Sequence, residues 1–297
     1  MSGPAVRPRV VIVDGVPMSA LVAEAPEARA VIVALHGGGT VSNYFDCPGH
    51  PELSLLRLGA SAGFTVVALD RPGHGSSAAY AEAMDRPEHR VALAFGAVNR
   101  ILDQRPRGAG LFLLGHSGGC ELALRMATSS HADDLLGLEL GGTGRRYHPA
   151  AKEVMNAASR MDRPPGVREL LWEPTHFYPP DVLRGLTRAA GAPPYERAMA
   201  LNWPHQDFPA LAPQVRVPVR FTVGEHDQVF RADATALAEI AEMFAAAASF
   251  ASNLQPEAGH NLSLGYSAAD YHRKICAFVD ACAAGRSAAD DVDREAG

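Results

Sequence analysis

Short runs of apolar residues recur along the N-terminal part of the chain. Two of them, residues 10–13 and 18–22, flank Asp14 and Gly15, a dipeptide typical of the tight turn of a β-hairpin. The next run, residues 30–35, is apolar throughout, as expected of a strand covered on both faces. The pattern therefore predicts an N-terminal hairpin followed by a buried strand.

Helical patterns alternate with further apolar runs after this strand. The predicted helices cover residues 52–62, residues 88–104 and a stretch directly after Ser117, and the predicted strands cover residues 65–69, 111–114 and 135–140. Alternating strands and helices indicate a mostly parallel sheet with right-handed crossovers and helices on both faces.

The alternation stops between residues 144 and 213, a stretch rich in proline, arginine and aromatic residues, with helical patches and no convincing strand. It resumes with strands at 217–223 and 250–254 and helices at 233–248 and 268–281. We therefore predict an α/β core, residues 1–143 and 214–297, interrupted by a helical cap, residues 144–213, over the strand ends where open α/β sheets bind ligands. Residues 284–297 are small, polar and acidic, which predicts a disordered tail.

Candidate chemistry enters at residues 115–119, which read G-H-S-G-G between a predicted strand and a predicted helix. In this setting, G-x-S-x-G holds its serine in strained backbone geometry, with the hydroxyl exposed at the end of the sheet and beside a helix N-terminus. Ser117 is therefore the candidate nucleophile. An ordinary glycine-rich turn is the alternative interpretation.

A serine hydroxyl needs a base to take its proton and a third group to orient that base. Asp227 follows the predicted strand at 217–223, and His260 follows the one at 250–254. The three side chains are thus expected along one edge of the sheet, with His260 as the base and Asp227 as the orienting acid. Glu225 and Asp233 are rivals for the acid.

Glycines after the strand at 30–35 are candidates for an oxyanion hole. Residues 36–39 read H-G-G-G, so backbone N–H groups can face a ligand with no side chain in the way. We predict that Gly118 and either Gly38 or Gly39 supply the two donors. A phosphate-binding loop is the competing interpretation, but neither G-x-x-x-x-G-K-[ST] nor G-x-G-x-x-G with a later acidic residue is present.

Together these motifs resemble the α/β-hydrolase superfamily along nearly the whole chain. They are H-G-G-G at 36–39, D-R-P-G-H-G-S at 70–76, G-H-S-G-G at 115–119, and the paired loops at 224–227 and 259–260. The order of nucleophile, acid and base in that superfamily matches Ser117, Asp227 and His260. The resemblance implies an eight-stranded, mostly parallel sheet with a cap after the sixth strand, and esterase, lipase, thioesterase or related acyl-transfer chemistry.

Other reactive residue types near these motifs have simpler explanations than catalysis. Histidines in glycine-rich loops commonly bond to the backbone, the residues after position 70 read as a turn, and a cysteine one turn past the nucleophile packs beneath it. We expect structural roles for His36, Asp70, His74, His116 and Cys120.

Composition narrows the partners and the compartment. The 297 residues carry a formal net charge of −6 and no cluster of Lys and Arg, which argues against nucleic acid as a partner. There is no signal-peptide pattern, and no apolar run approaches the ~20 residues of a membrane span. The four cysteines have no metal-ligand or disulfide-framework spacing, so we expect free thiols, no metal and a cytoplasmic protein. The oligomeric state is left open.

These features favour a serine hydrolase that cleaves an ester, thioester or lactone bond of a small apolar substrate without a cofactor. The alternatives are an acyltransferase or cyclase on the same triad, a C–C bond hydrolase, and a non-catalytic binding module. Four aromatic residues of the cap are as consistent with an acyl pocket as with a small core of the cap itself: Trp172, Phe177, Tyr178 and Trp203.

Overall fold

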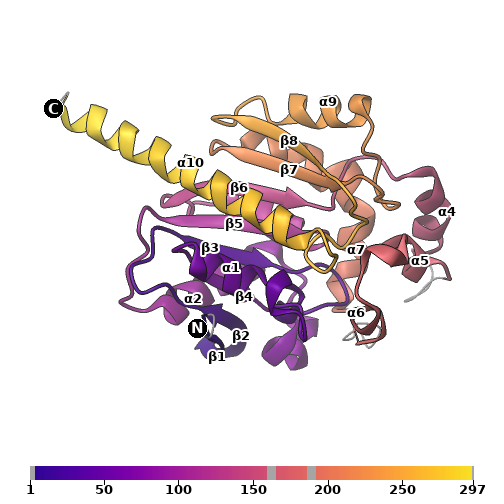
Figure 1. Cartoon of the computed structure of the whole chain (residues 1–297), viewed down its shortest axis with the longest axis horizontal. Helices are drawn as coiled ribbons and strands as arrows, with labels where there is room; N and C mark the ends of the chain where they lie inside the picture. The colour runs from indigo at the N-terminus through magenta and orange to yellow at the C-terminus, as the bar shows by residue number, and fades with distance from the viewer. Residues whose placement is uncertain (1–3, 159–164, 186–191, 296–297) are drawn as a thin grey trace.

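The computed structural model describes residues 4–158, 165–185 and 192–295. In this part of the chain, eight strands form one sheet in the order β1-β2-β4-β3-β5-β6-β7-β8 (Figure 1). The β1–β2 and β2–β4 pairs are antiparallel, and the other pairs are parallel. The strands are β1 (Val6–Val13), β2 (Val16–Ala23), β3 (Val31–Leu35), β4 (Thr65–Leu69), β5 (Leu111–His116), β6 (Leu135–Gly141), β7 (Val219–Gly224) and β8 (Phe250–Gln255).

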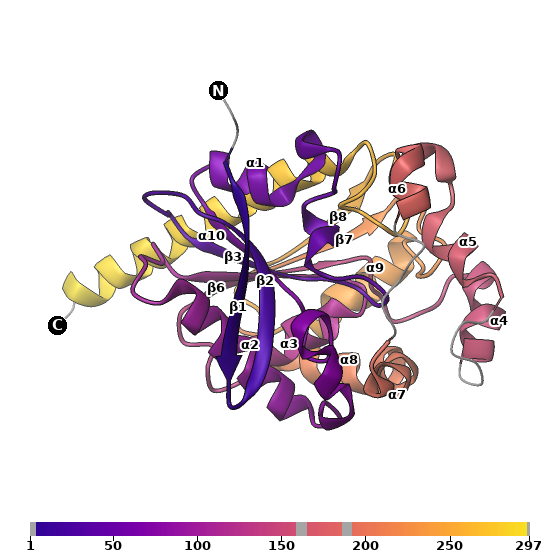
Figure 2. The same cartoon turned by 90° about the horizontal axis from the view of Figure 1, so that it is seen from below.

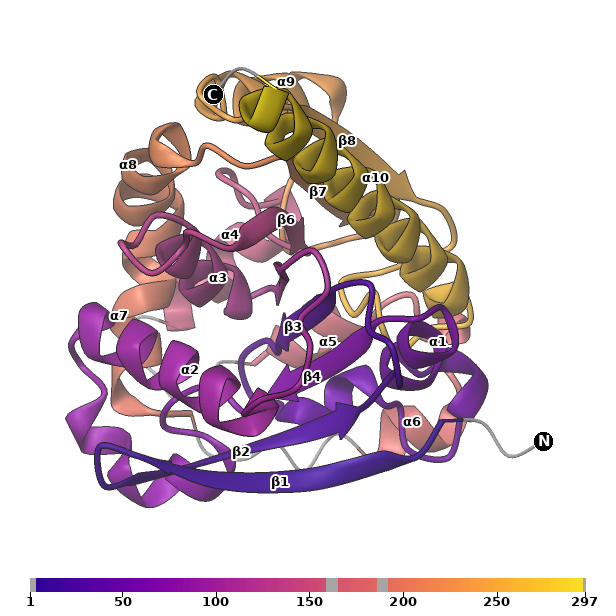
Figure 3. The same ribbon diagram turned by 90° about the vertical axis from the view of Figure 1, so that its left-hand side faces the viewer.

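The N-terminal hairpin forms because its turn residues accept a backbone conformation that most residues avoid. Asp14 and Gly15 both have positive φ, 48° and 81°, which matches the twist of the flanking strands. The hairpin lies at one edge of the sheet (Figure 3). Further in, every residue of β3, β4 and β5 is buried, so both faces of these strands are covered.

Helices cover both faces and divide the core into two layers. The helices α1 and α10 pack on one face, and α2 and α3 pack on the other (Figures 2 and 3). The helices are α1 (Leu55–Ser61), α2 (Pro87–Leu102), α3 (Gly119–Ala127), α4 (Pro149–Ala158), α5 (Val167–Trp172), α6 (Pro180–Gly185), α7 (Pro194–Asn202), α8 (Phe208–Leu211), α9 (Ala234–Met243) and α10 (Ala268–Glu295). The expected fold class, a mostly parallel eight-stranded sheet with helices on both faces, is confirmed.

The segment between β6 and β7 contains the helices α4 to α8, and its described residues form no strand apart from a single bridge between Tyr147 and Phe230. We call residues 144–213 the cap. Helices α4 to α7 lie beyond the ends at which the parallel strands finish (Figure 1). Among the described residues, no helix combines the length and the apolar character needed to cross a membrane.

The last two helices, α9 and α10, end at other residues than the sequence predicts. Helix α10 continues to Glu295, so the segment predicted to be disordered is helical as far as that residue. Its alanines have the highest helix propensity, and extending an existing helix requires no new nucleus. Helix α9 ends at Met243 rather than near residue 248, because Phe244 turns into the core, where its ring stacks on Phe250 with 5.5 Å between centroids.

Candidate active site

Ser117 stands on a sharp turn between β5 and α3. Its φ is 48°, a conformation that costs energy for a residue with a side chain and that the surrounding contacts must hold. Its N–H donates to the carbonyl of Gly141 at 2.8 Å, and a Cβ on Gly119 would lie only 2.1 Å from the carbonyl oxygen of Leu35. The turn therefore needs glycine beside the serine, and it leaves Ser117 partly exposed.

A chain of hydrogen bonds joins Ser117 to His260 and Asp227. The Ser117 Oγ lies 3.0 Å from His260 Nε2, and His260 Nδ1 lies 2.9 Å from Asp227 Oδ2. The other carboxylate oxygen, Oδ1, accepts the N–H groups of Val229 at 2.7 Å and Phe230 at 3.3 Å. The carboxylate is therefore fixed by backbone donors on one side and accepts from the imidazole on the other.

The rival acids are engaged elsewhere. Glu225 is exposed, and its carboxylate accepts the N–H of Glu257 at 3.2 Å. Asp233 is the N-cap of α9, where its side chain accepts the N–H of Ala236 at 3.2 Å. Of the three acidic candidates, Asp227 is the one that contacts His260.

The glycine-rich loop after β3 runs directly beside the serine turn. A Cβ on Gly37 would lie 3.1 Å from the Cβ of Ser117, and a Cβ on Gly118 would lie 3.4 Å from the backbone nitrogen of Gly38. Gly38 itself is exposed. Gly39 has a positive φ of 66° and turns the chain away. This geometry favours Gly38, rather than Gly39, as the partner of Gly118 for a developing oxyanion.

The neighbouring histidines have structural partners. His116 is buried and stacks on Tyr44 with 4.5 Å between ring centroids, and burial followed by the nearby His260 keeps its pKa well below the usual range. Burial and the neighbouring Arg71 likewise lower the pKa of His36, so this imidazole is neutral. His36 Nε2 accepts the N–H of Arg71 at 3.0 Å, which leaves its Nδ1 to donate to the Gly37 carbonyl at 2.8 Å.

Asp70 also has a structural role. Its Oδ1 accepts the N–H of Ser42 at 2.6 Å, and its Oδ2 accepts the hydroxyl of Ser19 at 2.5 Å. The carboxylate thus joins β2 to the loop after β3 and makes no contact with His260.

The cysteines are inert by environment. All four are free and buried, and burial raises the pKa of each thiol, including Cys120 beneath the serine turn. Within the described ranges, no group of three or more His, Cys, Asp or Glu side chains is placed to hold a metal ion.

Three of the cap aromatics that the sequence singles out dock the cap onto the core. Trp172 and Tyr178 are buried edge to face with 5.2 Å between centroids, and the Tyr178 hydroxyl accepts the N–H of Asn261, next to His260, at 3.3 Å. Trp203 Nε1 donates to the Thr143 hydroxyl at 2.8 Å. Phe177 is partly exposed beside His226. A substrate-binding role for the four aromatics remains a prediction.

Sequence reasoning missed four residues around the site. The sequence around Arg71 indicates only a turn, yet the Arg71 side chain is 1% exposed and pairs with Glu196 from α7. The side chain of Met199 reaches within 3.4 Å of where a Cβ on Gly118 would lie, and the Phe230 ring lies 6.5 Å from that of His260. No local pattern marks these residues, because the contacts of Arg71 with Glu196, of Met199 with Gly118 and of the Phe230 ring with His260 all join positions distant in sequence.

A serine on a strand–helix turn, paired with imidazole and carboxylate from later strand ends on a mostly parallel sheet, defines the α/β-hydrolase class. The family model described as Alpha/beta hydrolase family matches residues 32–272. The chain belongs to this family. Comparison with curated proteins gives no match.

Solved structures agree on the fold. The esterase RhEst1 from Rhodococcus sp. ECU1013 is 20% identical with a TM-score of 0.65 over 93% of this chain and 98% of that one. The enol-lactonase from Burkholderia xenovorans LB400 is 19% identical with a TM-score of 0.63 over 92% and 100%. The thioesterase domain from the curacin biosynthetic pathway is 16% identical with a TM-score of 0.60 over 93% and 99%.

Proposed function

We propose that the protein is a serine hydrolase that cleaves an ester, thioester or lactone bond of a small apolar substrate through an acyl-enzyme. The observation that carries the proposal is the continuous chain of contacts from Ser117 through His260 to Asp227, at 3.0 and 2.9 Å. These are the separations that general base catalysis requires between heavy atoms.

In this mechanism the Ser117 oxygen attacks the carbonyl carbon while His260 Nε2 takes the hydroxyl proton. The N–H groups of Gly38 and Gly118 stabilise the negative charge that develops on the carbonyl oxygen. His260 then donates its proton to the leaving oxygen or sulfur as the bond to the acyl carbon breaks. A water molecule, deprotonated by His260, releases the acid and restores Ser117.

Asp227 keeps His260 in the correct tautomer. Its Oδ2 accepts a hydrogen bond from the Nδ1–H group, which keeps the proton on Nδ1 and leaves Nε2 free to act as a base toward Ser117. Because Oδ1 is held by two backbone N–H groups, the carboxylate cannot rotate away without breaking those bonds. Asp227 also stabilises the imidazolium that forms after proton transfer.

The substrate class follows from the surroundings and from the similar structures. The Met199 side chain lies near Gly118 and the Phe230 ring lies 6.5 Å from that of His260, so apolar groups are close to the reacting atoms, which suits an apolar acyl chain. The structural neighbours are described as an esterase, an enol-lactonase and a thioesterase domain, names that refer to ester, lactone and thioester bonds. Those descriptions support the reaction type and leave the particular ester open.

A substrate panel tests the proposal. We expect p-nitrophenyl acetate and butyrate, an acyl thioester or a lactone to be hydrolysed by the wild type and not by Ser117→Ala. The Ser263→Ala variant is the matched control. Ser263 is a buried serine three residues after His260, but it contacts Tyr44 and His272 rather than His260. Wild-type turnover that survives in Ser117→Ala would rule out Ser117 as the nucleophile. Transfer of the acyl group to an added alcohol in place of water would instead favour the acyltransferase.

A further inference from the structure

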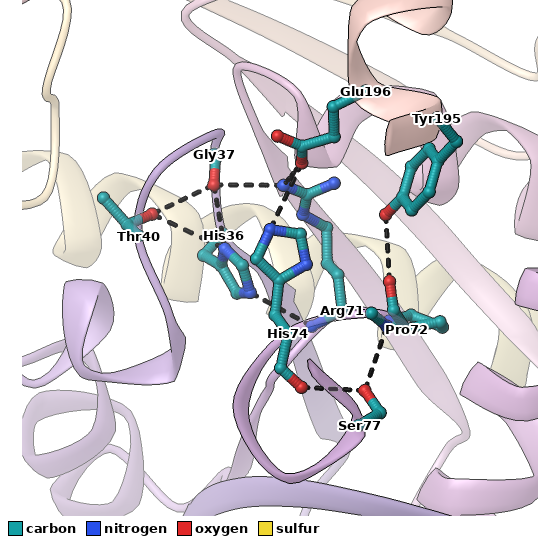
Figure 4. Close-up of polar contacts among 10 residues, drawn as sticks. His36, Gly37, Thr40, Arg71, Pro72, His74, Ser77, Tyr195 and Glu196 are labelled. Atoms are coloured by element: carbon teal, nitrogen blue, oxygen red, sulfur yellow. Dashed lines mark hydrogen bonds and ion pairs between the residues drawn. The ribbon is translucent and has the colours of Figure 1, made fainter. Parts of the chain in front are cut away.

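Three donors converge on one carbonyl oxygen in the loop beside Ser117. The Gly37 oxygen lies 2.8 Å from His36 Nδ1, 3.0 Å from the Thr40 hydroxyl and 3.1 Å from Arg71 Nη2 (Figure 4). A peptide unit is planar and trans, so its carbonyl and its N–H point in opposite directions. Holding the Gly37 oxygen therefore also sets the direction of the Gly38 N–H.

Arg71 is the charged member of this set, and α7 of the cap supplies its counter-charge. The Arg71 Nη2 that donates to Gly37 also contacts Glu196 Oε1, and His74 Nε2 lies 3.3 Å from the same oxygen. Both partners are almost completely buried. Burial alone would raise the pKa of the Glu196 carboxyl, but Arg71 and His74 outweigh it and lower the pKa to about 2. Glu196 is thus charged at any working pH.

The beginning of α7 is docked on the loop that contains Arg71. The Tyr195 hydroxyl donates to the Pro72 carbonyl at 3.0 Å (Figure 4). The Arg90 guanidinium lies over the Tyr195 ring, 4.1 Å from its centroid. One oxygen of Glu196, Oε2, lies 3.5 Å from where a Cβ on Gly38 would be. The carboxylate of this cap residue therefore reaches the glycine loop itself.

We propose that Glu196 and Arg71 are positioning residues for the oxyanion hole: Glu196 holds the Arg71 guanidinium against the Gly37 carbonyl, and this contact aims the Gly38 N–H at the developing charge. The inference rests on the proposed function, since it assigns Gly38 as a donor to the oxyanion. It makes a residue of the cap part of the machinery that stabilises the transition state, although that residue lies 125 positions from Arg71 in the sequence.

A role of the Arg71–Glu196 pair in stability alone is the alternative. The two roles predict different effects on kcat. Buried ion pairs can often be replaced by apolar side chains of similar size without loss of stability. An interaction that matters only in the transition state changes kcat and leaves KM unaltered. A pair with no role beyond stability changes neither once the protein is folded.

The test replaces both charges at once, in the variant Arg71→Met/Glu196→Leu, so that no unpaired charge is left buried. With p-nitrophenyl acetate we expect kcat to fall by about 10- to 100-fold, somewhat less than the 10²- to 10³-fold that complete loss of an oxyanion donor costs, while KM stays within about threefold. The inhibition constant of a trifluoromethyl ketone, which forms a tetrahedral oxyanion on the serine, should rise by the same factor as kcat falls. Glu196→Gln, which keeps the shape of the side chain, serves as a second variant with a smaller loss in the same direction.

The matched control is Tyr195→Phe. It removes a hydrogen bond between the same helix and the same loop but leaves the contacts of Arg71 with Gly37 and Glu196 intact. We expect its kcat to stay within about twofold of the wild type. If Tyr195→Phe loses as much kcat as the double variant, general attachment of α7 explains the effect and the inference is wrong. It is also wrong if the double variant folds and keeps its kcat.

Hydrogen exchange separates this inference from the proposed function. In the absence of substrate, the amides of residues 36–40 should exchange faster in Arg71→Met/Glu196→Leu than in the wild type. Their exchange rates in Tyr195→Phe should equal those of the wild type. Unaltered exchange in the double variant would overturn the inference even if the wild type hydrolyses esters. Faster exchange in a protein whose wild type turns over no ester would support the positioning contact and count against the proposed function.

Discussion

Ser117 and Asp227 are held by the backbone of the core, whereas the peptide between Gly37 and Gly38 is held by side chains, one of which depends on the cap. Ser117 donates through its N–H to the Gly141 carbonyl, and the Asp227 carboxylate accepts two backbone N–H groups. The Gly37 carbonyl instead accepts from His36, Thr40 and Arg71, and Arg71 is paired with Glu196.

The difference has a functional consequence. Backbone hydrogen bonds within the sheet and its turns persist as long as the core is folded, so Ser117 and Asp227 should keep their positions when Glu196 is replaced. We propose that the peptide between Gly37 and Gly38 can be altered by changing Glu196 of the cap alone. Mutations can therefore change the triad and this peptide separately.

The largest effect is expected from removing the base. We expect His260→Ala to lower kcat toward p-nitrophenyl acetate by about 10⁴- to 10⁶-fold, because His260 Nε2 is the base that contacts the Ser117 hydroxyl in the described part of the chain. Steady-state kinetics measure the loss. His226→Ala is the control, since this exposed imidazole lies near Asp227 in sequence but contacts Phe177 and Glu225. A His260→Ala variant within tenfold of the wild type would mean that a different base is used.

The next effect is expected at the orienting acid. Asp227→Asn should lower kcat by about 10³- to 10⁴-fold, because an amide donates to Nδ1 and so favours the wrong tautomer of His260. Glu225→Gln changes an exposed carboxylate two residues away and should leave kcat within about twofold. Equal losses in the two variants would contradict the assignment of Asp227.

The turn that holds Ser117 should tolerate no added side chain. Gly119→Ala places a Cβ 2.1 Å from the Leu35 carbonyl oxygen, so we expect the free energy of unfolding to fall by about 1–3 kcal/mol. The reaction of Ser117 with a fluorophosphonate should also slow. Gly285→Ala, in α10, meets no atom within 4 Å and should raise the free energy of unfolding by about 0.5–1 kcal/mol. Urea unfolding measures both, and a destabilising effect of the same size at the two positions would contradict the packing described.

The smallest effect is a pH dependence of stability from the cap. The folded pKa of Glu196 lies near 2, below the ordinary value of 4.5, so its contribution to stability is fully present above about pH 4.5 and is lost as the pH falls toward 2. The difference in the free energy of unfolding between the wild type and Glu196→Gln should shrink over that interval. Urea titrations at pH 5, 4 and 3 measure it, and a difference that does not change with pH would show that the Arg71–Glu196 pair is not charged as described.

The sequence predicts the strands and the triad residues much better than it predicts the side-chain contacts around the Gly37 carbonyl. The hairpin follows from Asp14 and Gly15, and each parallel strand follows from a short apolar run next to a helical pattern. The candidates Ser117, Asp227 and His260 could be chosen because each lies on the turn or loop that follows a strand, and parallel strands end at one edge. These signals are local, so a single sequence carries them.

The contacts that the sequence does not predict join distant segments. Nothing near Arg71 indicates that its charge is buried against Glu196, and nothing near Glu196 indicates a functional role. The helical extension of α10 was missed for a different reason, since small, polar and acidic composition resembles that of a disordered tail, while alanine also favours helix. The Arg71–Glu196 pair depends on which segments pack together, and the extension of α10 depends on the helix that precedes it. Composition encodes neither.

The most direct test of the account is the mass of the intact protein after incubation with a fluorophosphonate. An activated Ser117 forms a bond to phosphorus as fluoride leaves, with its proton passing to His260. We expect one adduct on the wild type, mapped to Ser117 by peptide digestion, and none on Ser117→Ala or His260→Ala. An unlabelled wild type, or an adduct that persists in Ser117→Ala, would contradict the assignment of Ser117 as the nucleophile.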